Sequence, residues 1–302
     1  MGGTKSAGGA YLVVTNPGTD VAARERAVAA LRSAGETRVA VTETADELDA
    51  ALDGRGEAVV VVAGGDGTLH AVVAALHRRG ELGGVTLGLV PLGTGNDFAR
   101  GTGLPLDPAA AALVVTTGHG APMDLVVDDT GGVVVNSVHA GAGSVAALRA
   151  ERWKARLGRV GYPIGAVLTA LRPPTLRLRV EVDGTVVTTR DEQVLQVAVG
   201  NGPQVGGGTE LVPDAEPHDG RLDVIVSRPV GALAMAAYAV DLVRGRHHRR
   251  ADVRDLRGRE VTVVGEEFWC SADGETYGPV RRRTWRIEPA AYTLLVPGAP
   301  PG

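Results

Sequence analysis

The chain has 302 residues, of which 44% are hydrophobic and 22% are charged, and its formal net charge is −4. This composition is typical of a soluble globular protein and gives no overall basic field for nucleic acid, which we exclude as a partner. The length favours two domains, each with its own core. The single cysteine, Cys270, excludes a disulfide framework, and the seven histidines lack the spacing of a zinc site. We therefore expect a cytoplasmic protein.

The first 120 or so residues alternate short β-branched runs with helical patterns. The predicted strands are 11–15, 38–42, 58–63 and 85–90, and the predicted helices are 21–34, 45–52 and 69–79. Thr44 and Glu47 have the spacing of a capping box, and Gly35 and Gly80 follow the last turns of their helices. This alternation predicts an α/β N-terminal domain, with a parallel sheet and helices on its faces.

After about residue 122 the pattern changes to pairs of strands. Residues 176–182 and 186–189 flank Asp183-Gly184, a dipeptide typical of a hairpin turn. Further strands are predicted at 194–199, 222–227, 261–264, 268–271 and 284–288, and helical segments near 145–172 and 231–245. We predict a nucleotide-binding domain over 1–121 and a mostly antiparallel, β-rich substrate domain over 122–302, with about the last 15 residues packing back on the first domain.

Two glycine-rich loops follow predicted buried strands: Gly64-Gly65-Asp66-Gly67-Thr68 and Gly93-Thr94-Gly95-Asn96-Asp97. Glycines let backbone N–H groups approach a phosphate closely, and the start of a helix adds a positive partial charge. A carboxylate beside a phosphate requires a cation between them, so Asp66 and Asp97 predict magnesium. The alternative for the first loop is a tight strand-to-helix turn that Asp66 caps.

Loops at the carboxyl ends of parallel strands converge on one crevice, so we expect these two loops to form one phosphate site. Thr94 and Asn96 offer side-chain donors there. Asn16-Pro17-Gly18-Thr19-Asp20 follows another strand and either supplies the other lip of the crevice or is an ordinary turn.

Two other patterns narrow the choice of nucleotide site. The chain has no Gly-x-x-x-x-Gly-Lys-Ser/Thr sequence, so it is not a P-loop enzyme. Residues 141–146 match the dinucleotide-binding pattern of glycines, but they lack an acidic residue about 20 positions further on in a βαβ context. We therefore do not expect a nucleotide at 141–146.

The motifs together resemble the catalytic domain of the soluble diacylglycerol kinase family, which also includes sphingosine and ceramide kinases. The resemblance rests on Gly-Gly-Asp-Gly-Thr at 64–68, Pro-Leu-Gly-Thr-Gly-Asn-Asp-Phe-Ala-Arg at 91–100, Asn-Gly at 201–202, Gly-Gly-Gly at 206–208, Pro-Asp-Ala at 213–215, Asp-Gly-Arg-Leu-Asp at 219–223 and Asp-Gly-Glu at 273–275. NAD kinases and phosphofructokinases share Gly-Gly-Asp-Gly, so the ordered set is the specific feature.

The resemblance implies an ATP-dependent lipid kinase of two domains with the active site in the cleft between them. Its reaction would transfer the γ-phosphoryl group to a lipid hydroxyl, in the first place that of diacylglycerol, giving phosphatidic acid. The residues that resemble the ATP-binding set are Asn16, Pro17, Gly18, Thr19, Asp20, Thr42, Gly64, Gly65, Asp66, Gly67, Thr68, Leu69, His70, Thr94 and Asn96.

The same resemblance suggests a catalytic set and a second metal site. Glu275 resembles the proton acceptor, and Asp66 with Asp97 would hold the magnesium that bridges the phosphates. Asp219, with the carbonyls of Glu216 and Arg221, resembles a second magnesium site. Ordinary turn chemistry is the alternative at Asp219 and Glu275, because each adjoins an Asp-Gly pair.

The chain departs from the family pattern at two places. Asp20 and Val21 stand where the family has Gly, often followed by Lys, which puts one phosphate contact in doubt. His70 stands where the family commonly has Asn.

The acceptor is less defined by the sequence than the nucleotide site. Alternatives are a sphingoid or other lipid, a soluble substrate such as NAD, or a non-catalytic nucleotide-binding regulator. The joint presence of Asp66, Asp97, Asp219 and Glu275 argues against the regulator, which would need no base.

A basic segment follows the apolar stretch 232–243, and it is formed by Arg244, Arg246, His247, His248, Arg249 and Arg250. The apolar stretch is well short of the roughly 20 residues of a membrane-spanning helix. An apolar helix with a basic end suits peripheral contact with anionic lipid at the inner face of the membrane. The alternative is a core helix whose solvated basic end is favoured by the helix dipole.

Overall fold

The computed structural model describes residues 9–141, 144, 175–228 and 231–298 of the chain. Contacts divide the chain into two compact units, unit 1 with Met1–Leu125 and Pro289–Gly302, and unit 2 with Val126–Glu288. Within the described ranges, we find no helix with the length and apolar character needed to cross a membrane.

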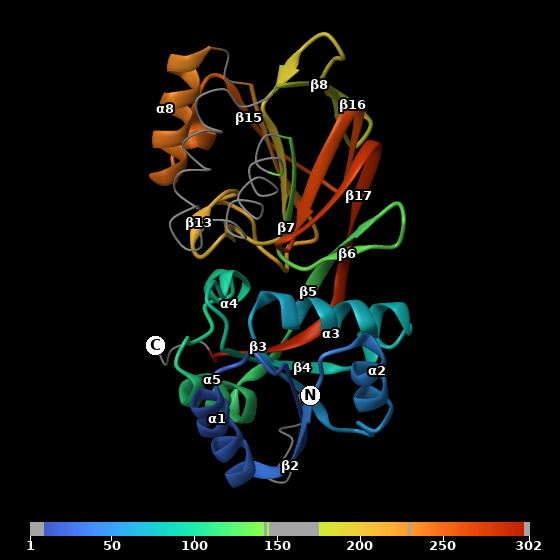
Figure 1. Ribbon diagram of the computed structural model, residues 1–302, viewed down its shortest axis with the longest axis vertical. Helices are drawn as coiled ribbons and strands as arrows, with labels where there is room; N and C mark the ends of the chain where they lie inside the picture. Colours follow the sequence, from blue (N-terminus) through green and yellow to red (C-terminus); the bar gives the residue numbers. More distant parts are fainter. Residues whose placement is uncertain (1–8, 142–143, 145–174, 229–230, 299–302) are drawn as a thin grey trace. The chain divides into compact units, whose positions relative to one another are not determined.

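Unit 1 is a parallel sheet with helices on both faces (Figure 1). Its strands are β1 (Gly9–Thr15), β2 (Gly35–Val41), β3 (Val59–Gly64) and β4 (Thr86–Pro91), and its helices are α1 (Val21–Ala34), α2 (Ala45–Asp53), α3 (Asp66–Arg78), α4 (Asp97–Gly101) and α5 (Pro108–Thr117), with the 3-10 turn η1 (Leu82–Gly84). The strand order is β2-β1-β3-β4, and all neighbours pair in parallel. The end of β17 (Glu275–Val296) adds a further parallel strand, where Thr293 pairs with Thr86.

The core of unit 1 explains why the strands of its sheet are buried on both faces. Helices α1 and α5 cover one face of the sheet, where Leu31 and Ala112 pack with Val13 and Val61. The alternate residues of the same strands, such as Val60, face the other way and are also buried. A parallel sheet covered on both faces needs continuous apolar strands, which these runs of valine supply.

Local signals position the helices of unit 1. The predicted helix 21–34 is confirmed, and so is the capping box of Thr44 and Glu47 at the start of α2. The predicted start of the third helix at residue 69 is wrong, because α3 begins at Asp66. The carbonyl of Gly65 already accepts from the N–H groups of Thr68 and Leu69, at 3.0 and 3.1 Å, so the glycine loop leads into the helix three residues early.

Unit 2 is a mostly antiparallel β structure. Its elements are β6 (Val133–Val134), β7 (Ser137–Gly141), β8 (Leu176–Val182), β9 (Thr185–Thr188), β10 (Gln193–Val194), β11 (Gln196–Gly200), β12 (Gln204–Val205), β13 (Thr209–Glu210), β14 (Leu222–Ser227), α8 (Ala232–Val243), η3 (His247–Arg249), β15 (Val253–Gly258) and β16 (Glu260–Ala272). Strands β15, β14, β11, β7 and β16 follow one another as antiparallel neighbours. Strand β5 (His119–Asp128) and β17 each contribute residues to both units.

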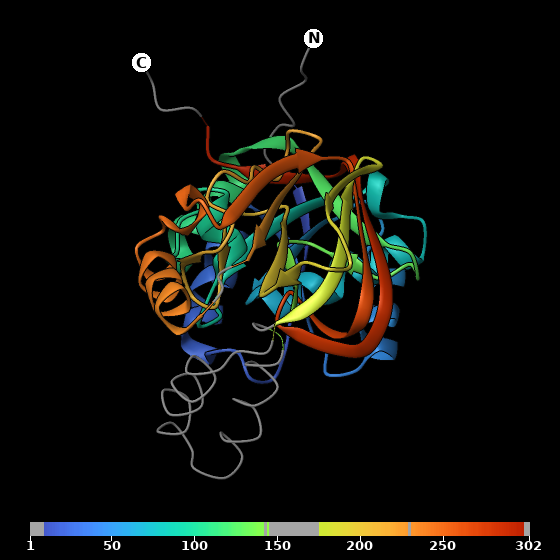
Figure 2. The same ribbon diagram turned by 90° about the horizontal axis from the view of Figure 1, so that it is seen from above.

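Strand β16 connects two parts of the β structure of unit 2, and it runs beside β17 (Figures 1 and 2). Its first half pairs with β8 and its last residues pair with β7, with register shifts between Val264 and Cys270. The predicted strands 261–264 and 268–271 are therefore one strand interrupted by a bulge. A bulge bends a strand, so one segment can serve two pairings. Phe268, Trp285 and Val180 pack in the core that results.

The fold class predicted from the sequence is confirmed: an α/β unit with a parallel sheet and a mostly antiparallel β unit. The hairpin at Asp183-Gly184 is also confirmed, with Val182 paired to Thr185. The helical segment predicted near 145–172 and most of the glycine pattern at 141–146 lie outside the described residues.

Candidate active site

The loops after β1 and β3 meet at the carboxyl edge of the sheet of unit 1. The amide Nδ2 of Asn16 donates to Thr68 Oγ1 at 2.8 Å, and its Oδ1 accepts from the N–H of Gly18 at 2.9 Å. Strands β2 and β3 lie on opposite sides of β1 in the sheet. The carboxyl end of β1 is therefore the point where the strand order reverses. Open α/β sheets bind ligands at this point, outside the carboxyl ends of the strands.

The loop after β4 packs directly on the loop after β3, through a close approach of two glycines. A Cβ atom at Gly93 would lie 2.5 Å from the Cα of Gly65, and one at Gly65 would lie 3.0 Å from the Cα of Gly93. Gly93 therefore has no room for a side chain, and one at Gly65 would fit only if Gly93 shifted by a few tenths of an ångström. The amide of Asn96 holds the second loop closed, accepting from the N–H of Gly93 at 2.9 Å and donating to its carbonyl at 2.8 Å. The predicted convergence of the two loops is observed.

The carboxylate of Asp66 holds the start of α4. Its Oδ2 accepts from the N–H of Asp97 and its Oδ1 from the N–H of Phe98, both at 3.1 Å. The two predicted magnesium ligands, Asp66 and Asp97, are thus brought together by a contact between residues 31 positions apart. Carboxylate oxygens are ligands that Mg²⁺ prefers, and accepting one N–H per oxygen is compatible with such a role. Asp66 and Asp97 are therefore residues of the type that magnesium prefers, and the contact joins the Asp66 carboxylate to the backbone of Asp97.

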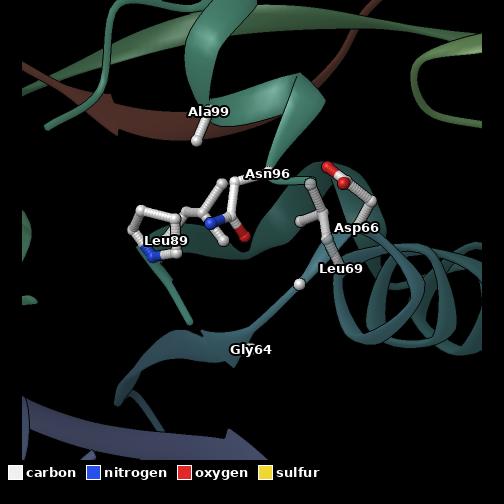
Figure 3. A pocket seen from close by; sticks show the side chains of 8 residues that line it. Gly64, Asp66, Leu69, Leu89, Asn96 and Ala99 are labelled. Carbon is white, nitrogen blue, oxygen red and sulfur yellow. The ribbon is translucent and has the colours of Figure 1, made fainter. Parts of the chain in front are cut away.

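A small hollow lies between these loops (Figure 3). Its lining residues are Gly64, Gly65, Asp66, Leu69, Leu89, Pro91, Asn96 and Ala99. Beside it, a Cβ atom at Gly67 would meet nothing within 4 Å, so the first turn of α3 leaves its backbone open to a ligand. The arrangement can therefore accept an anion at the N-terminus of a helix.

The remaining residues of the predicted nucleotide set divide into accessible and structural positions. Pro17, Gly18, Asp20, Gly67 and Thr94 are exposed, and Thr42 and His70 are half-buried. Thr19 and Leu69 are buried, so their side chains serve the fold, and the Thr19 hydroxyl accepts from Thr15 Oγ1 at 3.1 Å. Asp20 caps α1 by accepting from the N–H of Ala23. This cap gives a structural reason for the carboxylate at position 20.

In unit 2, Glu275 is exposed at the start of β17, directly after a two-residue turn. The turn residues Asp273 and Gly274 both have positive φ, 46° and 89°, as a tight hairpin turn requires. The carboxylate of Asp273 accepts three backbone N–H groups, from Val135 at 2.7 Å, Asn136 at 2.9 Å and Ser137 at 3.1 Å. These bonds fix the hairpin that carries Glu275.

Asn136 is a structural residue next to this hairpin that the sequence analysis did not identify. Its carbonyl accepts from the N–H groups of Asn201 and Gly202, at 2.8 and 2.7 Å, and a Cβ at Gly202 would lie 2.1 Å from its Oδ1. The Asn-Gly motif at 201–202 is thus explained by a third segment. The available signal was an asparagine directly after the apolar run from Val133, the same pattern as Asn16 after β1.

Arg257 lies beside Asp219, the predicted ligand of the second magnesium ion. The Asp219 carboxylate pairs with the Arg257 guanidinium and also accepts from the N–H of Arg221 at 2.9 Å. The carbonyl of Glu216 accepts from the N–H of His218 at 2.8 Å. The cation in contact with the Asp219 carboxylate is thus the Arg257 guanidinium, and the magnesium site at Asp219, Glu216 and Arg221 stays a prediction.

A neighbouring carboxylate, Asp223, is buried beside the same arginine. Its Oδ1 lies 2.9 Å from Arg257 Nε. Burial raises the pKa of Asp223 to about 7, and the negative charges of Asp255, Asp214 and Glu216 act in the same direction. The contact with Arg257 therefore does not offset the burial and the neighbouring acids that act on Asp223.

The basic segment after α8 is only partly a surface feature. Arg244, Arg246 and Arg249 are exposed, whereas His247 is buried and its Nε2 lies 2.9 Å from the carbonyl of Leu211. Arg250 pairs with Asp241 at 3.0 Å and Asp252 at 2.8 Å. The predicted lipid contact is therefore wrong for His247, because burial removes its ring from the surface.

Two families match the chain, one over each part. The diacylglycerol kinase catalytic domain matches residues 11–127, and the YegS C-terminal NAD kinase beta sandwich-like domain matches residues 136–296. A Klebsiella pneumoniae protein named probable lipid kinase YegS-like is 36% identical to this chain over 297 residues, which cover 95% of each chain. A diacylglycerol kinase of Mycobacterium tuberculosis is 31% identical over 310 residues, covering 96% of each chain.

Solved structures agree on the fold. A putative diacylglycerol kinase from Bacillus anthracis has a TM-score of 0.78 at 23% identity, covering 96% of this chain and 98% of its own. An NAD kinase from Archaeoglobus fulgidus in complex with ATP has a TM-score of 0.53 at 13% identity, covering 95% of this chain and 93% of its own. The chain therefore belongs to the diacylglycerol kinase family, together with the YegS-like lipid kinases.

Proposed function

We propose that this member of the kinase family transfers the γ-phosphoryl group of ATP to a lipid hydroxyl, with diacylglycerol as the acceptor and phosphatidic acid as the product. The observation that carries the proposal is the convergence of three loops at the switch point of unit 1, made by the Asn16–Thr68 bond and the Gly65–Gly93 approach. The names of the relatives support a lipid acceptor. Unit 1 is then the nucleotide domain and unit 2 the substrate domain.

Unit 1 would position the phosphates by backbone groups. Gly67 is exposed in the first turn of α3, with open space on its Cα, and the helix dipole favours negative charge placed there. Asp66 and Asp97 would hold magnesium, which when bound neutralises charge on the β- and γ-phosphates. Asp66 at the same time keeps α4 in place through its two backbone bonds. Positioning and charge neutralisation are most of what phosphoryl transfer requires of a protein.

Unit 2 would supply the base. Glu275 is exposed and sits on a hairpin held by three bonds to Asp273, so its carboxylate is accessible on a rigid support. In the proposed role it accepts the proton of the lipid hydroxyl as the oxygen attacks. No step of this mechanism uses Asp219, whose carboxylate pairs with Arg257.

Replacing Glu275 by Gln tests the assignment. The amide has the same shape and cannot accept the proton, so we expect turnover to fall by about 10² to 10⁴ with little change in ATP affinity. Glu267→Gln, on the neighbouring strand β16 and also exposed, is the matched control. A wild-type rate in the Glu275 variant would refute the role of base.

The acceptor is tested with radiolabelled ATP and thin-layer chromatography. The panel contains diacylglycerol, a sphingoid base, ceramide and NAD, the last without lipid or detergent. We expect label in phosphatidic acid. Label in NAD alone would replace the lipid proposal by a soluble substrate, and ATP binding without transfer to any acceptor would favour a regulator.

We also propose that the enzyme meets its lipid substrate as a peripheral protein at a membrane surface. Three exposed arginines, Arg244, Arg246 and Arg249, support this proposal, because anionic headgroups attract clustered basic side chains.

A further inference from the structure

Helix α8 exposes an apolar ridge to solvent. Leu233 is 89% exposed, Val243 is 86% exposed and Val240 is 48% exposed. Leu233, Ala237 and Val240 are spaced by four and three residues, so they lie along one stripe of the helix, and Ala236 beside them is also exposed. Figure 1 shows α8 on the outside of the β-strands of unit 2. A surface helix normally turns such a stripe toward the core.

The opposite face of α8 already has its partners in unit 2. Tyr238 is buried, and its hydroxyl lies 3.0 Å from Ser227 Oγ. Leu242 packs against the same cluster as Tyr238, with Ile225 and Ala198. The helix is therefore held firmly by its inner face, and the ridge is not needed for packing against the strands.

The apolar part of the ridge carries no negative charge, whereas the exposed Glu210 of β13 lies at its basic end, where a Cβ atom at Gly245 would be 2.5 Å from Glu210 Oε2. Residues 232–240 contain no charged side chain. The one acid of the helix, Asp241, pairs with Arg250 at 3.0 Å and lies 3.7 Å from Arg246. An anionic surface would therefore meet no opposing carboxylate along the first turns of α8.

Positive charge gathers at the end of the same stripe. Arg244 follows Val240 by four residues and so extends the ridge, and Arg246 and Arg249 are exposed just beyond it. The chain as a whole carries a net charge of −4, so this patch is opposite in sign to the rest of the molecule. An apolar stripe that ends in arginines suits the boundary of a bilayer. The apolar side chains can contact the acyl chains, and the arginines can contact the phosphates of the headgroups.

We infer that α8 docks the protein on bilayers that contain anionic phospholipid, with Leu233, Val240 and Val243 at the acyl boundary and the three arginines at the headgroups. The inference rests on the proposed function, since it names the surface that would bring the enzyme to a lipid substrate. A second copy of the chain is a poorer partner for the ridge. A parallel copy would bring the arginines together, and an antiparallel copy would place them over residues 232–240, which offer no acid.

Vesicle flotation without ATP tests the docking surface. The vesicles contain phosphatidylcholine alone or mixed with phosphatidylglycerol, and we expect flotation only with the anionic mixture. Leu233→Gln with Val243→Gln should weaken the apparent partition by about tenfold or more. The matched control is Val21→Gln with Leu113→Gln, which are 53% and 59% exposed on α1 and α5 of unit 1.

A triple variant tests the basic part of the docking surface. Arg244→Gln, Arg246→Gln and Arg249→Gln together should abolish the preference for anionic vesicles, while Arg281→Gln, another exposed arginine, should leave it unchanged. The inference would be overturned if the ridge variant and the arginine variant both floated as well as the wild type. A change from dimer to monomer in the ridge variant without loss of flotation would also overturn it, since the ridge would then bind a second copy.

Insertion is read out by a fluorophore at position 243. The only cysteine of the chain, Cys270, is buried, so Val243→Cys can be labelled selectively with an environment-sensitive dye. We expect a blue shift on adding anionic vesicles, and no shift would overturn insertion.

Kinase activity on diacylglycerol in detergent micelles separates this inference from the proposed function. The ridge variants should keep that activity. A wild type that floats without kinase activity would contradict the proposed function alone, and an active kinase that does not float would contradict the docking surface alone.

Discussion

The carboxylate of Asp273 should contribute more to the stability of unit 2 than an ordinary hairpin residue does. It accepts three backbone N–H groups from the segment Val135–Ser137, at 2.7, 2.9 and 3.1 Å, and all three donor residues are buried. We consider Asp273→Gly, because glycine keeps the positive φ of 46° without strain and removes the carboxylate that accepts these bonds.

The magnitude follows from the donors left behind. A buried N–H group without a partner costs about 1–3 kcal/mol, and three neighbours relax together, so we expect a loss of about 3–5 kcal/mol in the free energy of unfolding. Asp273→Asn keeps one acceptor oxygen and tolerates positive φ, so its loss should be about half as large. Asp273→Ala should lose about 1 kcal/mol more than the glycine variant, because of its Cβ in the left-handed region.

Asp183 is a matched control for this experiment. It also has positive φ, 48°, precedes a glycine in a hairpin turn and accepts two backbone N–H groups, from Arg259 and Glu260 at 2.8 and 2.9 Å. These bonds are exposed, so water can replace the carboxylate and Asp183→Gly should cost about 1 kcal/mol. Urea unfolding followed by circular dichroism measures both variants. Equal losses for Asp183→Gly and Asp273→Gly would refute the argument from buried donors.

Three further outcomes are expected. Gly93→Ala should abolish ATP binding in calorimetry, because its Cβ would push the two loops apart, whereas Gly67→Ala should stabilise α3 by about 0.5 kcal/mol and weaken ATP binding; wild-type affinity in both would contradict the site. Burial lowers the pKa of His139 to about 4, so the neutral ring stabilises the fold above about pH 6.5, and about 3 kcal/mol should be lost as the pH falls from there toward 4. That slope should disappear in His139→Asn urea titrations, and an unchanged slope would exclude His139 as its source. Chelation with EDTA should leave the Tm of the nucleotide-free protein unchanged if the ion pair of Asp219 with Arg257 replaces a metal there. A fall of several degrees would show a bound metal.

Much of unit 1 was predictable because its signals are local. Helix capping at Thr44 and Glu47 and the glycine loops each lie within a few consecutive residues, so sequence spacing alone specifies their geometry. The convergence of the loops also followed, because the carboxyl ends of parallel strands share one edge of the sheet. The early start of α3 was missed, since the sequence does not reveal that the Gly65 carbonyl already closes its first turn.

The contacts of unit 2 were decided by residues far apart in the chain. Asp273 and Asn136 are 137 positions apart, and the pairing of Arg257 with Asp219 joins residues 38 positions apart. The sequence showed α8 as an apolar helix with a basic end, and only the tertiary structure showed which apolar residues face solvent and that His247 is buried. A local pattern states how a side chain is placed on its own helix or turn, whereas its partner depends on how the strands pair and which face the core covers.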